Sequence, residues 1–134
     1  MSYTAVTEDV VLQEGTFAFD FECSGTIYAG QAVEPIGTMQ VRAVQSTDVT
    51  GKGTLGVALY KQTDGNQIAI AGPGNIVRIR VSGTGTAVGD VLRSTYYGEW
   101  VEDRVGNNLF ISGVQAIALE TQATDGGECR VMLY

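Results

Sequence analysis

A short apolar strand followed by an Asp-Gly turn occurs twice in this chain of 134 residues. The first copy is Leu55–Leu59 with the turn Thr63–Gly65, and the second is Gln115–Leu119 with the turn Thr124–Gly126. In each copy a further strand follows the turn. Short strands separated by glycine-containing turns are typical of all-β proteins. The repetition therefore predicts two strand-turn-strand units of the same design.

The similarity between the two copies extends upstream, because Ala29–Val33 corresponds to Val88–Leu92. The offset is 59 residues at Gly30 and 61 at Asp64, so it drifts by only two residues. This spacing is too long, and the copies are too few, for a solenoid of stacked repeats. We therefore predict halves at about 28–81 and 87–134 within one domain. Chance is the alternative, since Gly-x-Val and Asp-Gly are common in any all-β protein.

The segment Thr16–Glu22 is the clearest single strand in the sequence. Its aromatic residues Phe17, Phe19 and Phe21 alternate with smaller or acidic residues, so the three rings lie on one face of a strand. We interpret this stripe as part of the core. A binding platform for sugars or bases is the alternative.

A second alternating strand is predicted at Ile76–Val81. Period two directs its valines and Ile79 inward, and it directs Arg78 and Arg80 outward. Because the protein is acidic overall, we expect these arginines to pair with acidic residues of the same chain or of a neighbouring subunit. Solvation of both side chains is the alternative.

No segment shows a helical period of useful length, and roughly ten short strands follow one another at intervals of about 8–12 residues. Glycine accounts for 18 of the 134 residues, which is about twice its usual share and indicates many tight turns. We predict an all-β fold, a compact single-domain β-barrel or sandwich built from the two related halves. Residues 10–134 form this domain, and residues 1–9 form an extended N-terminal arm.

Apolar and aromatic residues at two places suggest an interface. The arm has no clear period, and it either stays loose or orders against a neighbouring subunit or partner. An edge strand is expected directly after it. A turn near residues 96–100 is rich in aromatic residues, which either cap the core or lie at an interface. The predicted interface residues are Tyr3, Val6, Val10, Val11, Leu12, Tyr96, Tyr97 and Trp100.

The net charge is −7, with 8 basic and 15 acidic residues. A negative surface repels nucleic-acid backbones and anionic membranes, so neither is a predicted partner. Charged residues make up only 17% of the chain, below the usual share of about 25%, which favours a protein that covers part of its surface in an assembly. We expect no signal peptide, and no apolar run reaches the length of about 20 residues that a membrane span needs.

A catalytic or metal site is not expected. Histidine, the commonest general base and metal ligand, is absent. Cys23 and Cys129 are predicted either as two buried thiols or as one disulfide. Asp64 and Asp125 are expected to cap their own turns. Calcium binding is the alternative, but a calcium site needs clustered acidic residues, and these two are not clustered in the sequence. We therefore predict that the protein is not an enzyme and holds no cofactor.

Seven segments follow one another in a characteristic order along the chain. They are Val11–Gly15, Ala29–Val33, Gly56–Leu59, Gly89–Leu92, Gly113, Ile117–Leu119 and Arg130–Leu133. In this order the sequence resembles, from about residue 10 to the C-terminus, the tailed-phage capsid decoration (cement) proteins, a family found in phage and prophage head gene clusters. It departs from the usual pattern in long loops at Thr47–Gly53 and Arg104–Asn108, and in Gln31, which stands where an aspartate is common.

The resemblance implies a virion protein, made in the host cytoplasm, that binds the outer capsid surface of the mature phage head. Its partners would be the major capsid protein and, in a homotrimer, two further copies of itself. It would stabilise contacts between major capsid proteins, and the N-terminal arm would contact the capsid. The alternatives are a structural domain of a phage tail, baseplate or fibre, and a carbohydrate-binding β module.

Overall fold

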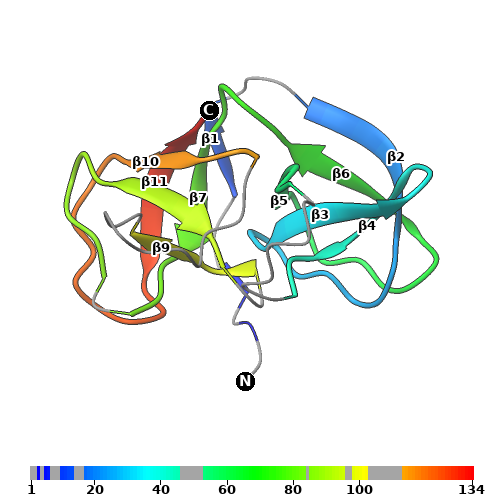
Figure 1. Cartoon of the computed structure of the whole chain (residues 1–134), viewed down its shortest axis with the longest axis horizontal. Helices are drawn as coiled ribbons and strands as arrows, with labels where there is room; N and C mark the ends of the chain where they lie inside the picture. The colour runs from blue at the N-terminus through cyan, green and yellow to red at the C-terminus, as the bar shows by residue number, and fades with distance from the viewer. Residues whose placement is uncertain are drawn as a thin grey trace.

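The computed structural model describes residues 3, 5, 6, 10–13, 17–45, 53–83, 85–95, 98–102 and 113–134. These residues form eleven strands and no α-helix, which confirms the predicted all-β fold (Figure 1). No helix in this part of the chain has the length and apolar character needed to cross a membrane. The strands are β1 (Val11–Gln13), β2 (Phe17–Cys23), β3 (Ala32–Gly37), β4 (Gln40–Ala43), β5 (Gly56–Ala58), β6 (Gln67–Ala71), β7 (Ile76–Arg80), β8 (Val91–Ser94), β9 (Trp100–Glu102), β10 (Ala116–Ala118) and β11 (Glu128–Leu133).

Strands β2 to β6 form a closed barrel with the order β2-β4-β3-β5-β6. All neighbours are antiparallel except β2 and β4, which run parallel and close the barrel through Cys23 and Val41. Alternation along each strand directs one set of side chains into the barrel. The buried residues of this interior are Cys23, Ile27, Val33, Val41, Ala58, Ile68 and Ile70.

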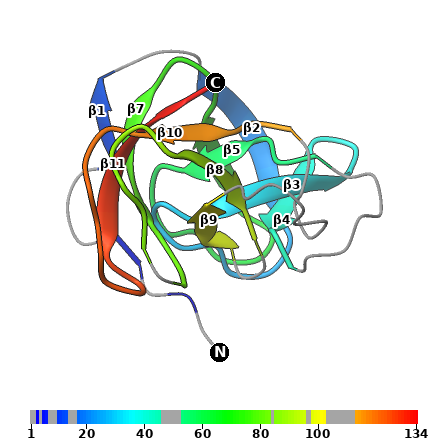
Figure 2. The same ribbon diagram turned by 60° about the vertical axis from the view of Figure 1, so that its left-hand side comes forward.

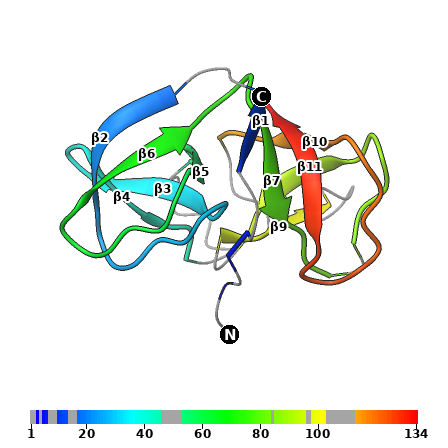
Figure 3. The same cartoon turned by 180° about the vertical axis from the view of Figure 1, so that it is seen from behind.

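Strands β7 to β11 repeat the same pairing and lie beside the first barrel, as the view from behind shows (Figure 3). In the six-stranded sheet β1-β7-β11-β10-β8-β9, β7 pairs with β11 as β2 pairs with β6, and β8 pairs with both β9 and β10 as β3 pairs with β4 and β5. A parallel bridge between Val81 and Trp100 matches the closing contact of the first barrel. The predicted internal repeat is therefore present in the strand pairing, which chance recurrence of short motifs does not explain.

The pairing also assigns each strand to a half. Strand β7, which the sequence places at the end of the first half, pairs with β11 and takes the position that β2 has in the first barrel. We refer to β2–β6 as the first half and to β7–β11 as the second half. Equivalent residues differ by 58 positions at Cys23 and Val81 and by 60 at Ala58 and Ala118.

The two halves share one core. Turned by 60°, the molecule shows β3 and β5 behind the strands of the second half (Figure 2). Ala32, Val57 and Ala71 point out of the first barrel, yet all three are fully buried in the same cluster as the interior of the second half. The hydroxyls of Thr54 and Ser94 also bond to each other across the two halves. The first half therefore packs one outer face against the second half.

Candidate functional site

The described residues of the N-terminal segment pack onto the domain. Tyr3 and Val6 are buried, with 7% and 6% of their surfaces exposed. The backbone N–H of Val6 donates to the carbonyl of Ala29 at 3.2 Å, and the Tyr3 hydroxyl donates to the same oxygen at 3.4 Å. Gly30 provides the space for this contact, because a Cβ atom there would lie 2.4 Å from Cγ2 of Val6.

Arg80 connects this segment to the second half. Its Nη2 atom donates to the carbonyl of Ala5 at 2.7 Å, and Nη1 donates to Gly126 at 3.1 Å. Its guanidinium also lies 3.8 Å from the carboxylate of Glu128, which confirms the predicted ion pair within the chain. Burial raises the pKa of Tyr3 well above its usual value; the positive charge of Arg80 acts in the opposite direction.

The other predicted interface residues lie in different environments. Val10 is buried, Val11 is half-buried in β1 against the core, and Leu12 also belongs to β1, although its side chain lies outside the described residues. Trp100 is fully buried, and its indole N–H has no hydrogen-bond partner among the described residues. The remaining two residues, Tyr96 and Tyr97, lie outside the described residues.

Burial within the chain leaves Tyr3, Val6, Val10 and Trp100 little surface to offer to another molecule. Their role in an interface stays a prediction. Of the aromatic stripe, Phe21 is half-buried against the first barrel's core, and the side chains of Phe17 and Phe19 lie outside the described residues.

The two Asp-Gly turns make equivalent bonds, but not the bonds that were expected. Asp64 accepts the backbone N–H of Gly25 at 2.8 Å, and Asp125 accepts that of Gly83 at 3.0 Å. Each carboxylate therefore caps a different turn that lies about 40 residues earlier in the chain, and not its own turn. Among the described residues, no three acidic, cysteine or histidine residues come together as a metal site would need.

Cys23 and Cys129 are both free and buried, so the disulfide alternative is wrong. Burial, followed by the nearby negative charge of Glu120, raises the pKa of the Cys129 thiol to about 11. The thiolate is the nucleophilic form of cysteine. Cys129 is therefore protonated, and poorly reactive, at neutral pH.

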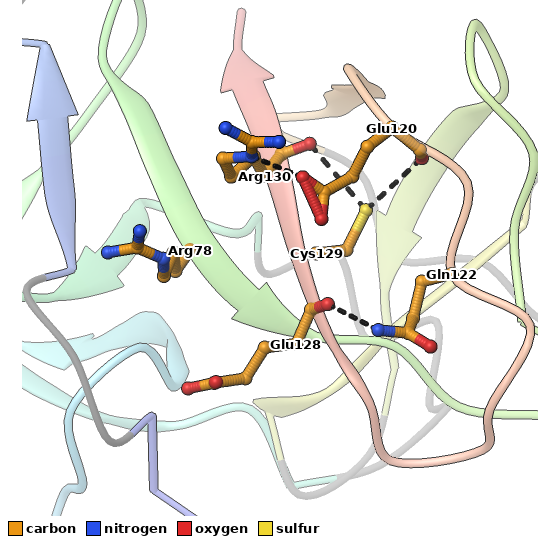
Figure 4. Close-up of a pocket in the computed structure, with 6 residues that line it drawn as sticks. All are labelled: Arg78, Glu120, Gln122, Glu128, Cys129 and Arg130. Atoms are coloured by element: carbon orange, nitrogen blue, oxygen red, sulfur yellow. Dashed lines mark hydrogen bonds and ion pairs between the residues drawn. The ribbon is translucent and has the colours of Figure 1, made fainter.

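A groove beside β7 and β11 is lined by six residues, Arg78, Glu120, Gln122, Glu128, Arg130 and the buried Cys129 (Figure 4). Its rim is polar: Arg130 pairs with Glu120, and the amide of Gln122 donates to the carbonyl of Glu128 at 2.7 Å. Sites for small molecules are lined mainly by apolar side chains around a few polar groups. This groove is lined mainly by polar and charged side chains, and its one thiol is protonated at neutral pH.

An exposed apolar surface on the second half was not identified from the sequence. Val91, Ile117 and Met132 stand side by side on β8, β10 and β11, because Ile117 pairs with both of the others. The neighbouring side chains of Val88 and Leu119 are 64% and 42% exposed. We call these five residues the open face. The alternation within β11 is the signal that could have placed Met132 outside.

The architecture of the described residues defines a class of protein, a duplicated all-β module. No protein-family model matches the sequence, and no curated protein matches it. Among solved structures, the chain is similar to the N base of the head fiber protein gp8.5 from bacteriophage phi29. The TM-score is 0.63 with 13% sequence identity, over 89% of this chain and 95% of that chain. At this identity the likeness shows a shared fold.

Proposed function

We propose that this protein is a structural component of a phage head, a decoration (cement) protein that binds the outer surface of the mature capsid. The observation that carries the proposal is the shared fold with a head fiber base, which extends over nearly the full length of both chains. The order of sequence motifs independently resembles that of capsid decoration proteins. Both lines of support favour a protein of the phage head.

In this function the protein acts as a homotrimer that bridges neighbouring major capsid proteins and stabilises the contacts between them. A trimer engages several capsid subunits at once, so each individual contact can be weak while retention is strong. The negative net charge agrees with a protein that does not bind the packaged DNA.

A carbohydrate-binding module is less well supported. Sugar platforms need exposed aromatic rings, whereas the single tryptophan, Trp100, is fully buried. A fibre domain remains the second candidate, because the similar solved structure is itself the base of a fiber. A head decoration protein and a head fiber base would both bind heads, and a tail or baseplate protein would not.

Co-sedimentation with mature heads that lack this protein tests the proposal. We expect the purified chain to sediment with the heads and to saturate at a fixed number of copies per head. Tails purified from the same phage serve as the control and should not carry the chain down. Binding to tails alone, or to neither particle, would contradict a head protein.

A further inference from the structure

The outer face of β3, β5 and β6 is buried in the first half of the chain. The equivalent face of β8, β10 and β11 in the second half is partly exposed to solvent. Ala32, Val57 and Ala71 lie side by side on β3, β5 and β6 and are fully buried. Their equivalents on β8, β10 and β11 are Val91, Ile117 and Met132 of the open face, which the strand pairing places in the same row. Met132 is 37% exposed, and the other two are half-buried.

Gly98, in the connection that precedes β9, packs on this face of the first half. Gly98 in this loop lies so close to the first half that a Cβ atom would come within 2.2 Å of Cγ of Gln31 and 3.0 Å of the backbone of Ala32. The second half thus places its β8–β9 connection on the face of the first half. Apolar side chains that would otherwise be exposed are removed from water there.

The equivalent connection in the first half is the β3–β4 turn, and among the described residues of the chain it packs on no such face. In the β3–β4 turn, Met39 precedes Val41 by two residues, as Gly98 precedes its equivalent Trp100. Both residues have positive φ, 53° at Met39 and 77° at Gly98. Met39 is 52% exposed, although large apolar side chains are usually buried.

Two glycine turns show the same contrast. Around Gly30 a Cβ atom would meet Val6, Tyr3 and the carbonyl of Arg78, whereas around the equivalent Gly89 it would meet no atom within 4 Å. The same difference separates Leu59, which packs against the core, from the exposed Leu119. Each of these compared features is covered in the first half and exposed in the second half.

From these relationships we infer that the open face binds the first half of a second copy of this chain. The Met39 turn of that copy lies against Asp90 and Val91, as the Gly98 loop lies against Gln31 and Ala32 within one chain. The two halves have the same strand pairing, so the contact between copies repeats the contact that already joins the halves. The inference deepens the proposed homotrimer by naming the surfaces through which the copies associate.

Such a contact is heterologous, because the open face of one copy meets a different surface of the next. Heterologous contacts join copies head to tail and form a ring when the rotation closes, as it would in a trimer. A contact between copies also explains why the apolar side chains of the open face are exposed, since contiguous exposed apolar surface marks interaction sites.

A mixing experiment tests the inference with the full chain. We expect the wild type to be oligomeric by light scattering at about 100 µM, a concentration at which contacts of micromolar Kd are populated. Met39→Asp blocks the turn, and Val88→Asp with Met132→Asp blocks the open face. Each variant alone should be monomeric, and an equimolar mixture should form a dimer, because one copy keeps an intact face and the other an intact turn. Thr26→Asp is the control for Met39→Asp. It also adds one negative charge, but at an exposed site that belongs to neither surface, and it should keep the wild-type mass.

Three outcomes would overturn the inference. These are a monomeric wild type, an unchanged mass of either blocked variant, and a mixture that stays monomeric while both variants keep the buried emission of Trp100. Head binding is measured separately. A monomeric wild type that binds heads, and that loses binding with Val88→Asp, would assign the open face to the capsid and leave the proposed head function standing. An oligomer that binds no heads would contradict the head function alone.

Discussion

Asp64 and Gly25 are 39 residues apart, yet the carboxylate of the first accepts the backbone N–H of the second at 2.8 Å. Asp125 makes the same bond to Gly83 in the second half. Each bond joins the Asp-Gly turn of its half to the turn that follows the first strand of that half. The two halves therefore share strand pairing and also the side-chain bonds that connect their turns.

The first prediction concerns these two bonds. Asp64→Ala and Asp125→Ala should each lower the free energy of unfolding by about 1 kcal/mol, because both remove an accepted hydrogen bond at an exposed turn. The double variant should lose the sum of the two effects, since the sites share no partner. Urea unfolding followed by the emission of Trp100 measures this. A loss in one half only would show that the two bonds are not equivalent.

The second prediction uses the equivalent glycines Gly30 and Gly89. Both have positive φ, 80° and 89°, so alanine should cost about 1 kcal/mol at either position. Gly30→Ala should cost a further 1–3 kcal/mol, roughly, because its methyl group collides with Val6. Thermal unfolding of the two variants separates these effects.

Val6→Ala provides the control for that collision. In this background the extra cost of Gly30→Ala should largely disappear, because the alanine side chain lacks Cγ2. Equal effects of Gly30→Ala with and without Val6 would contradict the packing of the N-terminal segment on this turn.

The third prediction compares two arginines. Arg80→Met should destabilise the protein by about 2 kcal/mol, because it removes bonds to Ala5 and Gly126 and a half-buried ion pair. Arg130→Met is the matched control: its side chain is 57% exposed, so water screens its surface pair with Glu120, and loss of that pair should change the urea midpoint little. The difference in urea midpoint measures the effect. Equal losses would indicate that Arg80 does not hold the N-terminal segment.

The fourth prediction concerns alkaline pH. The pKa of Cys129 is raised from 9.0 to about 11 in the folded protein, so the unfolded state releases this proton first as the pH rises. Stability from this group is present below pH 9 and falls between pH 9 and about 11. Cys129→Ala should flatten the pH dependence in this window. An unchanged slope would show that the thiol is solvated.

Several features of the fold could be predicted because they depend on local pattern. Alternation in residues 76–81 placed Val77, Ile79 and Val81 inside, and all three are buried. The duplication was visible from the repeated Asp-Gly turns. The partner of a strand is not encoded in its own alternation, so the membership of β7 in the second half became clear only from its pairing with β11.

The surfaces were harder to predict, because they depend on contacts between distant segments. The lack of periodicity in residues 1–9 suggested an arm that is loose or orders against another subunit, and it gave no sign that Gly30 leaves room for Val6. One signal was present in the sequence: alanine at position 32 and at position 71, where the halves meet, is replaced by the larger Val91 and Met132 on the open face. That comparison needs the residue-by-residue alignment of the halves that the structure provides.

Electron cryomicroscopy of mature heads, with and without the added purified chain, tests the central claim most directly. If this protein is a head decoration protein, the difference map should contain density at repeated positions on the outer capsid surface. The duplicated β fold should fit that density and bridge neighbouring capsid subunits. Heads that remain bare at saturating concentrations of the chain, or density confined to the tail, would contradict the claim.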